Sequence, residues 1–96
     1  MLVARTAVSE GHDVSVFLAG DAVQLLRPET AAATHGVGTG AFEEHVGALR
    51  EAHVPIYASG MSSKARGVDV GAAGAEPAQP QKLVELATAA DATLTY

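Results

Sequence analysis

Residues 54–67, VPIYASGMSSKARG, decide the fold of this chain. The first six residues are mostly apolar and β-prone, which predicts a strand over 54–59. Pro55 stands near the start of that strand, where a missing N–H is tolerated. Gly60 then allows the chain to turn sharply, and residues 60–67 predict a turn and a short helix. The stretch therefore predicts a strand that passes directly into a helix.

The same order occurs earlier in the chain, over residues 14–26. The apolar run 14–18 predicts a second, largely buried strand, which Gly20 and Asp21 end. A short helix is expected over 22–26, with Asp21 as its N-cap and Pro28 as its limit. Two such strand-to-helix turns indicate an α/β domain.

The remaining segments predict further helices, loops and one strand. Residues 2–10 have helical spacing up to Gly11, and a second clear helix is expected over 42–53. Pro80 fits the first turn of a last helix, and residues 92–96 predict a terminal strand. Two stretches rich in small residues are expected to be loops, 30–40 and 68–79.

Strands separated by helices favour a parallel sheet with right-handed crossovers. We therefore expect residues 1–96 to form a single α/β domain, a three-layer sandwich with a mostly parallel sheet. The chain begins inside a helix, although such a helix follows a strand in a parallel α/β domain, and three strands make a thin sheet. We therefore expect the natural domain to start upstream of Met1, so that the first strand is missing here.

The composition excludes several classes of protein. Acidic residues outnumber basic ones by 11 to 6, and the basic residues are scattered, so the chain lacks the basic patch of nucleic-acid-binding proteins. It has no cysteine, which excludes disulfides, thiolate metal sites and thiol chemistry. No apolar run is long enough to span a membrane, and we expect a cytoplasmic protein. Because 20 residues are alanine, burial gains little per side chain, and self-association is expected.

Two segments are expected at the carboxyl ends of the strands, where open parallel sheets bind ligands. In the first, Asp21 is either a polar contact to a ligand or only a helix cap. The second offers hydroxyls and basic side chains, which suit a small anion but also fit an ordinary capped turn. The candidate ligand-binding residues are Gly20, Asp21, Ser59, Gly60, Ser62, Ser63, Lys64 and Arg66, with His35 in the glycine-rich loop as a separate candidate.

The sequence offers no cofactor, metal or catalytic motif. Its four histidines lack the i, i+4 spacing of paired metal ligands on one helix. The segment from Gly60 lacks the final glycine of a nucleophile elbow, and the glycines of 36–40 open no dinucleotide-binding unit. We therefore expect no cofactor, no metal site and no catalytic residue.

Two segments resemble a known family. Residues 11–26, GHDVSVFLAGDAVQLL, and residues 49–67, LREAHVPIYASGMSSKARG, resemble the DsrE/DsrF-like family, and KARG at 64–67 is the most specific part. The likeness continues through 74–77 and 90–96. It implies a parallel α/β sandwich, commonly assembled as a trimer or hexamer, with a further strand and a full first helix at its start.

The resemblance also concerns the chemistry of the strand ends. Some members hold persulfide sulfur on a cysteine at or just after a strand end and relay it to partner proteins. The matching positions here are Ser59, Ser62 and Ser63, and His53 replaces the usual glycine of the preceding helix end. Because a serine hydroxyl does not act as a thiolate, the resemblance implies a related domain without its own thiol chemistry.

Three functions follow as alternatives. The first is an oligomeric DsrE-like domain that binds a small ligand or a protein partner and has no catalysis of its own. The second is a sulfur-relay subunit whose thiol lies on a partner protein. The third is a small hydrolase that uses Asp21 and Ser62.

Overall fold

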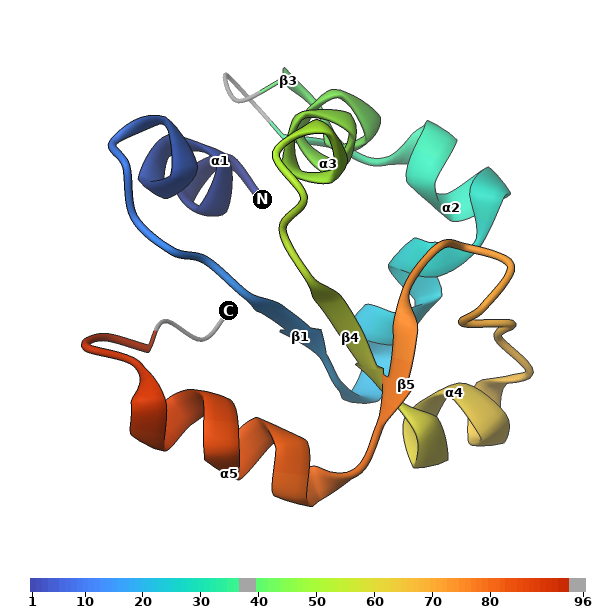
Figure 1. Ribbon diagram of the computed structural model, residues 1–96. Helices are drawn as coiled ribbons and strands as arrows, with labels where there is room; N and C mark the ends of the chain where they lie inside the picture. Colours follow the sequence, from blue (N-terminus) through green and yellow to red (C-terminus); the bar gives the residue numbers. More distant parts are fainter. Residues whose placement is uncertain (37–39, 94–96) are drawn as a thin grey trace.

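The structure, a computed structural model, describes residues 1–36 and 40–93, with the side chains of 35, 36 and 40 outside that description. Its centre is a parallel sheet in the order β1 (Val16–Leu18), β4 (Ile56–Ser59) and β5 (Glu76–Ala78) (Figure 1). In this sheet Tyr57 pairs with Phe17 on one side and with Glu76 on the other. The expected α/β fold with a parallel sheet is confirmed.

Helices lie on both sides of this sheet, which gives the domain its layers. Helices α1 (Leu2–Ser9) and α3 (Phe42–Glu51) contact each other on one side, and α5 (Pro80–Ala89) runs along the other (Figure 1). The short helix α2 (Pro28–Ala33) leads to an antiparallel pair, β2 (His35–Gly36) and β3 (Gly40–Ala41), beside α3.

A short helix follows the carboxyl end of β1, and another follows the carboxyl end of β4. The 3-10 helix η1 (Gly20–Leu26) follows β1, and α4 (Gly60–Arg66) follows β4. These two helices contact each other, so they form one continuous edge of the domain (Figure 1). Because β1 and β4 are parallel neighbours, the segments that follow them lie side by side, although they are about forty residues apart in the sequence.

The core lies between the sheet and the helices α3 and η1. On β4, Ile56 and Ala58 are buried, whereas Tyr57 and Ser59 are half-buried, as the alternation of a strand requires. The buried side chains pack with Leu18 of β1 and Val46 of α3. On the opposite face, the Lys82 Nζ of α5 lies 5.0 Å from the centre of the Tyr57 ring.

The stretch 30–40, expected to be a loop, contains regular structure instead. Pro28 is the first residue of α2, because its fixed φ and missing N–H suit the first turn of a helix. The three alanines that follow are strong helix formers. Phe42 then begins α3, which ends at Glu51, two residues before the expected limit at His53.

The third strand of the sheet is not the one that the sequence predicted. β5 lies at 76–78, inside the stretch 68–79 that was expected to be a loop. It pairs with β4 at the edge of the sheet, where a proline such as Pro77 is tolerated. Of the expected terminal strand 92–96, Ala92 and Thr93 belong to no strand, and 94–96 lie outside the described residues.

Two further observations concern the residues that the structure describes. No helix among them is long and apolar enough to cross a membrane. They also contain no group of three or more His, Cys, Asp or Glu side chains that could hold a metal ion.

Candidate functional site

The two strand-to-helix turns are joined by a direct hydrogen bond. The backbone N–H of Gly20, just after β1, donates to Ser62 Oγ in α4 at 3.0 Å. Gly20 has a φ of +58°, a conformation that costs residues with a Cβ atom. The glycine therefore turns its N–H toward the neighbouring turn and connects the ends of β1 and β4.

The start of α4 is fixed by a second serine. Ser59 is the N-cap of this helix, and its Oγ accepts a hydrogen bond from the backbone N–H of Ser62 at 3.2 Å. Both serine hydroxyls thus act as acceptors, and a hydroxyl has one hydrogen to donate as well. Within the described residues neither hydroxyl donates, so each is available to an acceptor atom of a ligand or partner.

An ion pair also connects α4 with η1 at the edge where β1 and β4 end. Arg66 directs Nε and Nη2 to a single carboxylate oxygen, Oδ1 of Asp21, each at 3.0 Å. The Asp21 side chain is 94% exposed, so this pair contributes little to stability. Its larger effect is on orientation, because it aligns the guanidinium of α4 with the start of η1.

Arg27 holds the far end of α4. Its Nη2 donates to the backbone carbonyl of Arg66, and its Nε donates to Gln24 Oε1 at 2.6 Å. This residue was missed by the sequence analysis. No spacing signal could have found it, because its partner lies 39 positions away in the chain.

The contacts define a surface that we call the strand-end rim. It consists of the residues that meet where β1 and β4 end, together with the exposed side chain of Met61 between Ser59 and Ser62. Its members are Gly20, Asp21, Ser59, Gly60, Met61, Ser62 and Arg66. Met61 is 72% exposed. An apolar residue in a polar turn was the signal that could have marked it in the sequence.

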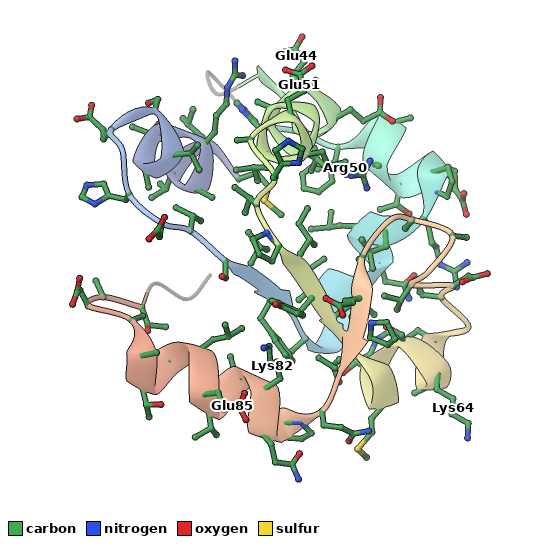
Figure 2. All side chains as sticks on the ribbon, viewed as in Figure 1. Glu44, Arg50, Glu51, Lys64, Lys82 and Glu85 are labelled. Carbon is green, nitrogen blue, oxygen red and sulfur yellow. The ribbon has the colours of Figure 1, made fainter. Side chains whose placement is uncertain are left out.

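Three of the sequence candidates lie away from this rim. Lys64 is exposed and points away from the body of the domain (Figure 2). Ser63 is only 3% exposed, and its Oγ has no hydrogen-bond partner among the described residues. His35 belongs to β2 beside β3, and its side chain lies outside the described part of the chain.

The expected capping role of Asp21 is wrong. The helix η1 begins at Gly20 instead of Ala22, and it has no side-chain cap. The Asp21 carboxylate instead pairs with Arg66, because the fold brings a long cationic side chain within its reach.

Comparison with known proteins gives the family. The family model of the DsrE/DsrF-like family matches residues 1–96. The chain belongs to the DsrE/DsrF-like family. No curated protein and no solved structure matches the chain significantly.

The rim of this DsrE/DsrF-like protein has hydrogen-bonding groups but no nucleophilic sulfur, because the chain contains no cysteine. Its cation Arg66 is paired with the exposed carboxylate of Asp21. Ser62 Oγ accepts from Gly20, and within the described residues it makes no hydrogen bond to Asp21, which would be required of a serine–carboxylate pair in a hydrolase.

Proposed function

We propose that this DsrE/DsrF-like protein is a thiol-free binding subunit whose strand-end rim docks a protein partner, and that the partner supplies the thiol of any sulfur relay. The family is linked to sulfur relay. The observation on which the proposal rests is Ser59 at the end of β4. It is one of the positions to which the family resemblance assigns a sulfur-carrying cysteine, and here its hydroxyl caps α4.

The rim has the properties of a small protein-docking surface. It combines the exposed apolar side chain of Met61 with the ion pair between the exposed Asp21 and the half-buried Arg66. Apolar anchors inside a polar surround are typical of protein interfaces, in which methionine and arginine are enriched. The free hydrogens of the Ser59 and Ser62 hydroxyls add two donors for carbonyl groups of a partner.

The test measures binding of sulfur-relay proteins from the same source, each charged with radiolabelled persulfide sulfur, to this chain. We expect at least one to bind, with the label remaining on the partner. Met61→Glu should weaken binding about tenfold, since it places a charge at the apolar anchor. The matched control is Val3→Glu on α1, which is 46% exposed and outside the rim. The proposal is wrong if no sulfur-relay protein binds, or if both variants weaken binding equally.

A small-anion ligand at the rim is the competing outcome. We expect sulfate and phosphate to leave the melting temperature unchanged, because Arg66 is paired with Asp21 and Lys64 points outward (Figure 2). A rise in melting temperature that Arg66→Gln abolishes would favour an anion site over a docking surface.

We also infer that the chain associates with copies of itself, as a trimer or hexamer. Members of the family are often oligomeric. In this chain, α5 has no buried residue, and Leu83 and Val84 on it are 40% and 60% exposed. A second copy that covers these side chains would add to a core that is small for a domain of this length.

A further inference from the structure

A cavity lies on the core side of the sheet, apart from the strand-end rim. It has a volume of about 340 Å³ and is lined by residues of β1, β4, η1, α2 and α3, together with Met1 and the segment 72–73. No residue of the rim lines it. The apolar side chains around it include Leu18, Leu25, Leu26, Phe42, Val46 and Ile56.

Two charged side chains line the same cavity, Glu43 in the first turn of α3 and Arg50 in its last turn. Both are exposed, so they mark where the cavity meets solvent. Seven residues of helix separate their Cα atoms by about 10 Å along the axis. The two charges therefore stand at opposite ends of the wall that α3 provides.

Arg50 is held in place by the segment that follows α4. Its Nη2 donates to the backbone carbonyl of Ala73. A Cβ atom built on Gly74 would lie 4.0 Å from Nε and Nη2 of Arg50, so the backbone of this turn runs directly beside the guanidinium. Arg50 extends from α3 toward α2, away from the outer side where Glu44 and Glu51 lie (Figure 2).

Most of the hydrogen-bonding capacity of Arg50 is unused. A guanidinium has five N–H donors. The bond to Ala73 is the one that Arg50 donates within the described part of the chain. The remaining donors are available to a carboxylate, which a guanidinium recognises in two-point geometry.

We propose that this cavity binds a small amphipathic carboxylate, with its apolar part among the side chains of the sheet and α3 and its carboxylate on Arg50. An apolar cavity of roughly 150 Å³ takes up benzene, so about 340 Å³ holds a molecule of roughly a dozen non-hydrogen atoms. A saturated or aromatic acid of this size fits. Glu43 lies about one screening length from the Arg50 end, so it opposes the bound carboxylate only weakly.

The experiment is calorimetric titration of the full chain with octanoate, 1-octanol and octylamine, which share one apolar chain and differ in charge. Octanoate should bind at least tenfold more tightly than octylamine. Arg50→Gln should abolish that preference while 1-octanol still binds, which shows that the variant is folded. The matched control is Arg5→Gln, an exposed arginine of α1 outside the cavity, which should leave all three titrations unchanged.

A second variant tests the cavity independently of charge. Ala31 of α2 lines the cavity and is half-buried. Ala31→Phe should fill part of the space and weaken octanoate and 1-octanol alike. The proposal is overturned if octanoate does not bind at about 1 mM, if octylamine binds as tightly as octanoate, or if Arg50→Gln or Ala31→Phe binds octanoate like the unaltered chain. None of these results bears on partner docking at the rim, because the two sites share no residue.

Discussion

At the scale of single residues, two glycines provide a matched test of how the rim is built. Gly20 has a φ of +58°, and an added Cβ would have nothing within 4 Å. Gly20→Ala should therefore lower the free energy of unfolding by about 1–2 kcal/mol through backbone strain alone. Gly47, inside α3, also has open space around an added Cβ but lacks a positive φ. Gly47→Ala should raise the free energy of unfolding by about 0.5–1 kcal/mol.

The measurement for this pair is urea unfolding at one protein concentration, with the change read from the midpoint at constant m-value. Equal effects of the two substitutions would contradict the assignment of strain to Gly20. The comparison is direct because both substitutions add the same methyl group in open space.

At the scale of elements, α4 depends on Ser59, the N-cap residue that precedes it. The helix has seven residues, so the hydrogen bond from the Ser62 N–H to Ser59 Oγ is a large part of what fixes its start. Ser59→Ala should lower the free energy of unfolding by about 1 kcal/mol. Ser9→Ala is the control, because Ser9 Oγ, at the end of α1, only donates to the carbonyl of Thr6 and caps no N-terminus. A loss at Ser9 as large as that at Ser59 would refute the capping role.

The elements also show what the sequence predicts well and where it fails. β1 and β4 were predictable because their apolar runs are bounded by glycine turns, and α5 because Pro80 opens it. β5 could not be predicted, since Glu76–Ala78 has no strand pattern of its own and is a strand only by pairing with β4. The rim was predictable as two neighbouring turns, whereas the pairing of Arg66 with Asp21 depends on a contact between residues 45 positions apart.

At the scale of the whole molecule, the sheet is covered unequally on its two sides. The side facing α3 contains the buried cluster around Leu18 and Ile56, whereas α5 on the other side has no buried residue (Figure 1). Leu83, Val84 and Ala87 lie on adjacent positions of the outward surface of α5, at spacings of three and four residues. A second copy of the chain that packs on this surface would cover the exposed apolar side chains of α5.

This arrangement predicts the effect of a charge on α5. Light scattering after size exclusion should give the unaltered chain a mass several times 9.7 kDa. Val84→Glu should shift the mass toward 9.7 kDa with an unchanged helical circular dichroism spectrum, because a charge cannot be buried unpaired at an apolar contact. Ala89→Glu is the matched control, since Ala89 is exposed on the same helix but lies about 140° from Val84 around its axis. A monomeric unaltered chain at about 100 μM would contradict self-association, and dissociation by both variants would place the contact elsewhere on α5.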